Sequence, residues 1–358
     1  MSIVFDNIVF SLQRVGGISR FWSRIIEPYL GDPSCLFIDD SGGNQNVFRS
    51  RIQVAPVAKD HLAPRKIARF LNFNRQFFDG KYVFHSSYFR VNNSPGCRNV
   101  TTVHDLIYED FGSGIGTALN LHQKKKALQS SSTIVCLSEN TRKDLYKHYP
   151  FCQEKPVVVI PNGVEGFHPS EFDQHLFSRL EIQEPRSYFL YVGHRGACKG
   201  FDRIHDVIDL LKGEFKCVVV GGPFDSKELT RIAERKHSQK IIHAGKVSDA
   251  ELNSLYGHAR FFFFPSLYEG FGLPPLEAMQ AGCPVLASNR SSIPEVVGDA
   301  GILFDPDDIE TLRTGLSAIL DEDVARRLIE SGLDRASRFG WKPVIDAYAS
   351  LYRQLLDV

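Results

Sequence analysis

The sequence predicts an α/β protein with two doubly wound parallel sheets. Short apolar runs, each followed by a turn, recur along all 358 residues, and stretches with helical spacing such as 204–211 separate most of them. This alternation of buried strand and helix is typical of a parallel sheet with helices on both faces. Twelve such runs are too many for one sheet of this kind, and the length also favours two domains.

The predicted strands are apolar runs of three to five residues, and they span 3–5, 35–38, 82–84, 100–103, 133–137, 157–160, 189–192, 217–220, 240–242, 261–264, 285–287 and 301–304. A polar segment that begins near Pro161 and ends near Pro185 separates the first six runs from the last six. We therefore predict an N-terminal domain at 1–165 and a C-terminal domain at 166–340. The last helix, 341–358, is expected to return to the first domain.

Composition narrows the class of protein. No run of eighteen apolar residues occurs, and the N-terminus lacks the pattern of a signal sequence. We expect a cytoplasmic protein, soluble or peripheral on the inner face of the cytoplasmic membrane. Seven cysteines without a C-x-x-C pair indicate reduced thiols, and the twelve histidines show no zinc-binding spacing.

The balance of 42 basic and 42 acidic residues hides an asymmetry along the chain. Residues 1–166 hold 20 Lys and Arg against 14 Asp and Glu, a net charge of +6, and the remainder holds 22 against 28, a net charge of −6. Different partners for the two halves are therefore expected. The excess is small and no recognition motif accompanies it, so nucleic acid is not an expected partner.

The segment from Glu269 to Glu277 carries the strongest functional signal. It places two carboxylates eight positions apart across a turn rich in Gly and Pro, directly after the aromatic run 261–264. That run predicts a strand buried on both faces, and the residues after Pro274-Pro275 predict a helix. Free N–H groups of Phe271, Gly272 and Leu273 would then point into the crevice where open α/β sheets bind ligands.

A second signal is the turn from Gly193 to Gly200, which follows a predicted strand. It contains Arg195 and Lys199, and glycines would let a pyrophosphate approach the backbone. The alternative is a solvated surface turn, because Gly-rich turns alone are weak signals.

Two weaker signals lie in the first half. Gly16-Gly17 forms a turn that opens a helix, and it does not match the dinucleotide-binding glycine pattern. His104 ends a predicted strand, where a ligand would reach it, although a lone His is more often structural. Asp105 would either orient His104 or cap the following turn.

Acidic and basic clusters complete the list. Asp305-Pro-Asp307 and Asp321-Glu-Asp323 match the D-x-D pattern of some metal-binding sugar transferases, but both resemble helix starts, so we predict no metal. The segment Arg65–Arg75 mixes cations with aromatics, and Lys124–Lys126 adds three cations. Both would suit an anionic membrane surface or, equally, a solvated helix face.

Motifs of one known family recur along the chain, at Gly16-Gly17, 103–105, 138–142, 160–163, 193–200, 220–223, 245–249, 264–269, 281–285, 291–295 and 298–301. They resemble the retaining family 4 glycosyltransferases of the bacterial lipopolysaccharide and O-antigen type. The resemblance covers in effect the whole chain. It implies the GT-B fold, in which two Rossmann-like domains face each other across a cleft, the first binding the acceptor and the second the nucleotide-sugar donor.

The resemblance also implies residue roles. Arg195 and Lys199 would hold the donor diphosphate, helped by the backbone at Gly16 and Gly17. Glu277 would bind the ribose, and Lys246 and Val247 would lie along the base. Glu269 and the N–H groups of Phe271, Gly272 and Leu273 would face the sugar and its phosphate, and His104 would touch the sugar near the reacting carbon. In many relatives the arginine follows the glycine directly, where this chain has His194, so the register of Arg195 stays open.

The implied reaction needs no metal. Glycosyl transfer builds positive charge at the anomeric carbon and negative charge on the leaving diphosphate, which Arg195, Lys199 and a helix N-terminus would stabilise. In the family's usual account the acceptor attacks the face that the diphosphate leaves, and a phosphate oxygen takes its proton.

We therefore predict an enzyme that transfers a hexose or N-acetylhexosamine to a lipid-linked or lipopolysaccharide glycan. Among donors, a UDP-sugar is favoured over GDP-mannose. One alternative is a nucleotide-sugar epimerase or a transferase with a soluble acceptor. Another is a non-catalytic subunit that binds nucleotide, although such a subunit would be free to lose Glu269 or Lys199, and both are present.

Overall fold

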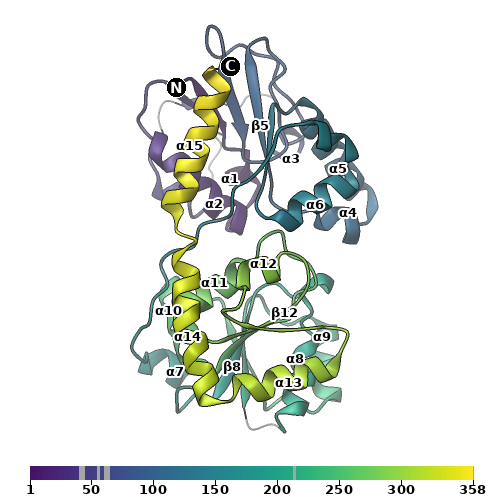
Figure 1. Ribbon diagram of the computed structural model, residues 1–358, viewed down its shortest axis with the longest axis vertical. Coiled ribbons are helices and arrows are strands. Elements are labelled where there is room, and N and C mark those ends of the chain that lie inside the picture. The colour runs from purple at the N-terminus through teal and green to yellow at the C-terminus, as the bar shows by residue number, and fades with distance from the viewer. Residues whose placement is uncertain (40–44, 55–56, 60–64, 213–214, 358) are drawn as a thin grey trace. The chain divides into compact units, whose positions relative to one another are not determined.

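The computed structural model describes residues 1–39, 45–54, 57–59, 65–212 and 215–357 (Figure 1). The chain divides into two compact units, Met1–Gly163 with Trp341–Val358, and Val164–Gly340. The helix α15 (Trp341–Asp357), yellow in Figure 1, thus belongs to the first unit. Among the described residues, no helix has both the length and the apolar character needed to cross a membrane.

The first unit is built on a parallel seven-stranded sheet in the order β3-β2-β1-β4-β5-β6-β7. Its strands are β1 (Ile3–Asp6), β2 (Cys35–Asp39), β3 (Val57–Lys59), β4 (Tyr82–Ser86), β5 (Cys97–Val103), β6 (Thr133–Cys136) and β7 (Val157–Val159). Its helices are α1 (Ile8–Leu12), α2 (Gly17–Ile26), α3 (Arg65–Ala68), α4 (Ile107–Phe111), α5 (Gly114–Ser130), α6 (Glu139–His148) and α15, with 3-10 turns η1 (Glu27–Tyr29), η2 (Arg49–Arg51) and η3 (Pro150–Glu154).

The second unit has a parallel six-stranded sheet in the order β10-β9-β8-β11-β12-β13. Its strands are β8 (Tyr188–Val192), β9 (Lys216–Val220), β10 (Ile241–Gly245), β11 (Phe261–Phe264), β12 (Val285–Ser288) and β13 (Ile302–Phe304). Its helices are α7 (Gln174–Arg179), α8 (Arg203–Leu210), α9 (Ser226–Glu234), α10 (Asp249–His258), α11 (Leu273–Gln280), α12 (Ile293–Val297), α13 (Ile309–Ile319) and α14 (Glu322–Ser337), with the 3-10 turn η4 (Ala197–Lys199).

The predicted fold class is confirmed. Each of the twelve predicted runs overlaps a strand, and all pairings in both sheets are parallel. The sequence missed β3, because this edge strand has only three residues and ends in a lysine, too short for a clear pattern.

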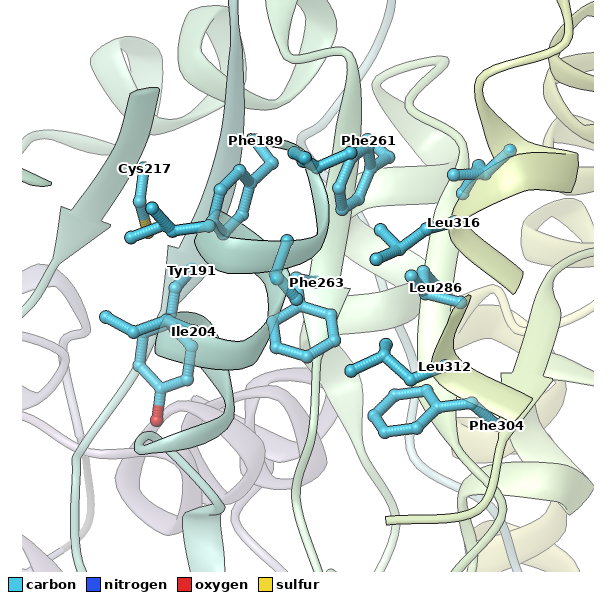
Figure 2. Close-up of a cluster of buried hydrophobic side chains, with 14 of the residues drawn as sticks. Phe189, Tyr191, Ile204, Cys217, Phe261, Phe263, Leu286, Phe304, Leu312 and Leu316 are labelled. Carbon is cyan, nitrogen blue, oxygen red and sulfur yellow. The ribbon is translucent and has the colours of Figure 1, made fainter. Parts of the chain in front are cut away.

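Alternation along β11 explains why four consecutive phenylalanines are all buried. Phe261 and Phe263 lie in the cluster of Figure 2, where Phe261 stacks on Phe189 of β8. Phe262 points to the opposite face and meets Tyr256 of α10 edge to face, with ring centroids 5.2 Å apart. Helices therefore cover both faces of this strand, as its composition predicts.

A buried polar network holds α15 on the first sheet. His85 of β4 contacts the Tyr352 hydroxyl through Nδ1 at 2.6 Å and the Thr102 hydroxyl through Nε2 at 3.0 Å. Tyr348 completes the network at 3.1 Å from the same threonine oxygen. Burial lowers the pKa of His85 to about 3, so its ring is neutral at neutral pH.

The basic segments differ from the prediction. Lys124 is buried and pairs with the Glu109 carboxylate at 2.8 Å, so only Lys125 and Lys126 are exposed. The predicted surface cluster of three lysines is therefore wrong, because the α5 face that carries Lys124 packs inward. Within Arg65–Arg75 the helix is the four-residue α3, and Arg69 bonds the Tyr88 hydroxyl at 2.9 Å. The residues 60–64 that precede it lie outside the described residues.

Candidate active site

The order of the second sheet reverses between β8 and β11, and ligands of open α/β sheets bind at the carboxyl ends of such strands. The turn after β8 contacts the turn after β11, because the Leu267 N–H donates to the Cys198 carbonyl at 2.7 Å. Gly200 permits this approach: its φ is +62°, and a Cβ there would lie 2.2 Å from the Pro265 carbonyl oxygen. Both predicted turns therefore meet at the expected place in the sheet.

Lys199 and Glu269 meet at this junction although 70 residues separate them in sequence. The Lys199 ammonium donates to Glu269 Oε1 at 2.8 Å, and the Ser266 hydroxyl donates to the same oxygen at 2.7 Å. Both side chains keep partial exposure, 24% for the lysine and 16% for the glutamate. The pair thus places one cation and one carboxylate where an anionic ligand would reach them.

Two serines fix the loop that follows Glu269. The hydroxyls of Ser291 and Ser292 donate to the Glu269 carbonyl at 2.7 and 2.9 Å, and Ser292 also contacts the Phe271 carbonyl at 2.8 Å. The carbonyls of the loop are therefore turned toward the start of α12. Sequence reasoning included these serines in the family motifs but gave them no role, since their partners lie more than twenty residues away.

The helix α11 begins at Leu273, earlier than predicted, because prolines fit the first turn of a helix. Gly272 precedes it with a φ of +98°, a conformation that favours glycine. Within the described residues, no acceptor is recorded for the N–H groups of Phe271, Gly272 and Leu273. Unpaired N–H groups and the helix dipole are the features by which helix N-termini can attract an anion.

Glu277 lies one turn into α11 and is buried. The Tyr256 hydroxyl donates to its Oε2 at 3.4 Å, a long hydrogen bond. The two glutamates of the motif therefore differ in their surroundings: Glu269 sits in the loop beside a lysine, and Glu277 on the helix beside a tyrosine.

Arg195 does not share a partner with Lys199. Its Nε donates to Glu228 Oε1 at 2.8 Å, and its Nη2 donates to Glu228 Oε2 at 3.2 Å and to the Pro223 carbonyl at 2.6 Å. The guanidinium also lies over the rings of Phe201 and Phe224, with its carbon 5.4 and 4.9 Å from their centroids. Glu228, on α9, escaped the sequence analysis; the only signal was a helix-capping pattern with Asp225.

The remaining predicted residues of this unit follow the carboxyl ends of β8 and of the edge strand β10. His194 is exposed, and its Nδ1 accepts the Gly196 N–H at 3.0 Å. Lys246 is exposed and Val247 half-buried, in the loop between β10 and the Ser248 cap of α10.

In the first unit, the predicted glycine turn opens a helix as expected. Gly16 caps α2 in an extended conformation and Gly17 is the first helical residue, with open space where a Cβ would lie. His104 follows β5, and its ring meets Phe21 of α2 edge to face at 5.0 Å. The structure therefore brings His104 beside the helix that Gly17 starts.

His104 is held neutral. Burial lowers its pKa to about 4, the Asp105 carboxylate opposes that shift, and the Lys124 ammonium adds to it. Asp105 Oδ1 accepts the Ile107 N–H at 3.2 Å. Of the two predicted roles, orienting His104 or capping the following turn, the structure thus shows the second.

The two D-x-D motifs are engaged in other contacts. Arg290 donates to Asp305 and Asp307 at 2.6 Å each, and Asp321 caps α14 by accepting two backbone N–H groups. In the described part of the chain, no group of three His, Cys, Asp or Glu side chains is arranged to hold a metal ion.

Comparison with known families gives two matches that together cover most of the chain. The model described as Glycosyltransferase Family 4 matches residues 43–165, and the model described as Glycosyl transferases group 1 matches residues 173–335.

Individual proteins agree with these matches. An O-antigen chain mannosyltransferase B of Escherichia coli is 29% identical over 312 residues, covering 82% of this chain and 78% of that protein. A serotype-specific mannosyltransferase WbdA of Escherichia coli is 38% identical over 86% of this chain, which spans only 40% of that longer protein. The solved structure of Anabaena Alr3699/HepE in complex with UDP and glucose has the same fold, with a TM-score of 0.74, 17% identity and coverage of 99% and 100% of the two chains.

Proposed function

The chain belongs to the glycosyltransferases that combine these two domains, and we propose that it is a retaining, metal-independent enzyme. It transfers a hexose or N-acetylhexosamine from a nucleoside diphosphate sugar to a lipid-linked or lipopolysaccharide glycan. The observation that carries the proposal is the arrangement of Lys199, Glu269 and the start of α11 at the strand switch of the second unit.

This arrangement suits the charges of glycosyl transfer. As the bond from the anomeric carbon to the diphosphate breaks, negative charge grows on the leaving phosphate and positive charge on the sugar ring. The Lys199 ammonium and the N–H groups of 271–273 would stabilise the leaving group, and the Glu269 carboxylate would face the sugar. The acceptor oxygen would bond to the face that the diphosphate leaves, and its proton would pass to a phosphate oxygen.

The roles of the other residues are part of the proposal. Glu277 would bind the ribose, Lys246 and Val247 the base, and Arg195 the diphosphate. We keep the backbone of Gly16 and Gly17 and the neutral ring of His104 as proposed donor contacts, and we assign acceptor binding to the first unit.

For the sugar, we propose mannose, because both curated relatives are named mannosyltransferases. A guanosine donor then becomes the stronger candidate, against the uridine donor that the sequence favoured and that the HepE complex contains. The names of the same relatives support an O-antigen type of acceptor.

Peripheral binding to an anionic membrane would bring the enzyme to a lipid-linked acceptor. On α5 the exposed side chains of Ile115, Leu119, His122 and Lys126 recur at helical spacing, so one stripe is apolar at its start and basic at its end. Wild type should sediment with vesicles of anionic lipid, and the variant in which Lys125 and Lys126 are changed to Glu should stay in the supernatant. Equal sedimentation of this variant and wild type would contradict the membrane role of α5.

Calorimetry with UDP and GDP, in EDTA and in magnesium, tests the donor and the mechanism. We expect one of the two diphosphates to bind with the same affinity in EDTA and in magnesium. Failure of both to bind, or binding that needs magnesium, would contradict the proposal. Retention is checked by NMR, since an α-linked donor should give an α-linked product.

A further inference from the structure

Arg195 and Lys199 occupy the same turn, yet their side chains are held in different ways. The Lys199 ammonium makes a single contact with a partly exposed carboxylate. The Arg195 guanidinium makes a two-point pair with Glu228 and also contacts a carbonyl and two aromatic rings. The Arg195 side chain is 8% exposed and the Glu228 side chain 13%. Arg195 is thus fixed in one orientation before any ligand binds.

The contacts of Arg195 leave one nitrogen of the fork unused. Arginine has five N–H donors on three nitrogens. The Nε and Nη2 groups face Glu228 and Pro223, and within the described residues no acceptor is recorded for Nη1. Gly221, which follows β9, lies beside this nitrogen: a Cβ there would lie 3.2 Å from Nη1 and 2.7 Å from the Gly193 carbonyl oxygen, so a side chain at this position would crowd the guanidinium.

Glu228 is itself anchored at the start of its own helix, α9. Its Oε2 accepts the Asp225 N–H at 2.8 Å, and the Asp225 side chain accepts the Glu228 N–H in return. This reciprocal cap fixes the first turn of α9, so the carboxylate cannot follow the guanidinium if the latter moves. The first turn of α9 therefore helps to fix Arg195, although Arg195 itself belongs to the Gly193–Gly200 turn.

We propose that Glu228 is a positioning residue for the donor: it holds Arg195 so that Nη1 alone is presented to the diphosphate. This inference rests on the proposed function, since it takes the diphosphate as the ligand of the Gly193–Gly200 turn. It explains why a carboxylate, which repels an anion, lies beside a phosphate-binding arginine.

Because the Glu228 carboxylate lies beside the proposed anion site, the two possible roles of Glu228 predict opposite changes in diphosphate affinity. If Glu228 were only a nearby negative charge, Glu228→Gln would remove repulsion and strengthen diphosphate binding. If Glu228 orients Arg195, the same change weakens the two-point pair and lowers diphosphate affinity about tenfold or more. Glu234→Gln, an exposed change on the same helix, is the matched control.

The experiment measures by calorimetry the affinity of wild type, E228Q, R195Q and the double variant for UDP, GDP and their monophosphates. We expect E228Q to lower diphosphate affinity more than monophosphate affinity, and to have no further weakening effect in the R195Q background. Thermal unfolding shows whether each variant is folded, and Glu228→Asp, which keeps the charge but shortens the reach, gives a second variant.

Three results would overturn the inference. Unchanged or stronger diphosphate binding by E228Q, with wild type binding normally, would remove the positioning role and leave the proposed function intact. An equal weakening by E228Q in the presence and absence of Arg195 would show that Glu228 acts independently of the arginine. Absence of diphosphate binding by wild type would overturn the inference and the proposed function together.

Discussion

The two sheets reverse their strand order at equivalent places, and a charged pair lies beside each reversal, but the two pairs differ in their exposure. In the first unit, between β1 and β4, Asp6 pairs with Arg90 at 3.2 Å, and the two side chains are 1% and 0% exposed. In the second unit, between β8 and β11, Lys199 and Glu269 pair with partial exposure. We call Asp6–Arg90 the sealed pair and Lys199–Glu269 the open pair, since the topology is the same and the exposure differs.

The neighbours of the two pairs explain the difference. The Ser86 hydroxyl donates to Asp6 Oδ2 at 2.7 Å, and Ser87 bonds the Asp6 carbonyl, so β1 and β4 are tied together beyond their ends. In the second unit Ser291 and Ser292 tie a backbone carbonyl of the loop, and Ser266 donates to the Glu269 carboxylate, which still keeps 16% of its side chain exposed. We therefore expect the sealed pair to act mainly on stability and the open pair, as part of the proposed site, mainly on binding.

The largest expected effect is on the sealed pair. Arg90→Met leaves Asp6 buried without its cation and should lower the free energy of unfolding by about 3–5 kcal/mol. Both tryptophans, Trp22 and Trp341, lie in the first unit, so tryptophan fluorescence in urea reports on that unit. Arg24→Met, in an exposed pair, is the control and should cost less than about 1 kcal/mol. Equal effects of the two changes would contradict the structural role of Asp6–Arg90.

The contact between the two turns of the second unit comes next. Gly200→Ala introduces a Cβ against the Pro265 carbonyl at a positive φ and should destabilise the protein by about 2–3 kcal/mol. Gly340→Ala meets nothing within 4 Å and should change little. Thermal unfolding followed by circular dichroism measures both, and an unchanged midpoint for Gly200→Ala would show that the turns are not in firm contact.

The open pair should affect binding more than stability. Lys199→Met should weaken diphosphate binding about 10- to 100-fold, since it removes a charged hydrogen-bond donor, and should lower the free energy of unfolding by at most about 1 kcal/mol. Calorimetry and urea unfolding separate the two effects, with the surface change Lys342→Met as control. A large loss of stability with unchanged diphosphate binding would show that the Lys199–Glu269 pair is structural, and it would contradict the proposed role of Lys199.

The smallest effect concerns pH. Because the folded pKa of His85 is lowered to about 3, the unfolded chain binds a proton near pH 6.5 while the folded one does not. The stability that His85 contributes is full well above pH 6.5 and declines as pH falls, by about 1 kcal/mol between pH 6.5 and 5.5.

Tryptophan fluorescence in urea at the two pH values measures this decline. His85→Gln should remove about half of it, because His104, whose pKa is lowered to about 4, contributes a similar decline, and the exposed-site change His122→Gln should leave it intact. A wild-type stability that is equal at pH 6.5 and 5.5 would exclude the buried neutral histidine.

The second unit also shows how far sequence patterns reach. The strand 261–264, the helix after it and the glycine turn at 193–200 are local patterns, and each was predicted near its observed place. The position of α15 on the first sheet, by contrast, depends on contacts such as His85–Tyr352, 267 residues apart. The inward turn of Lys124 shows the same limit, since its burial goes with a partner on another helix, Glu109 of α4, whereas β3 was missed because it has only three residues.

The sequence alone determined the alternation of strands and helices, the two parallel sheets, and the residue types at the strand ends, because hydrophobic period and turn chemistry act over a few residues. Only the tertiary structure decided which charges meet. Lys199 with Glu269, Arg195 with Glu228, and Asp6 with Arg90 are pairs whose members lie on different loops and helices. Their distances follow from the packing of the whole sheet, and the exposure of each pair follows from the side chains that the packing brings around it.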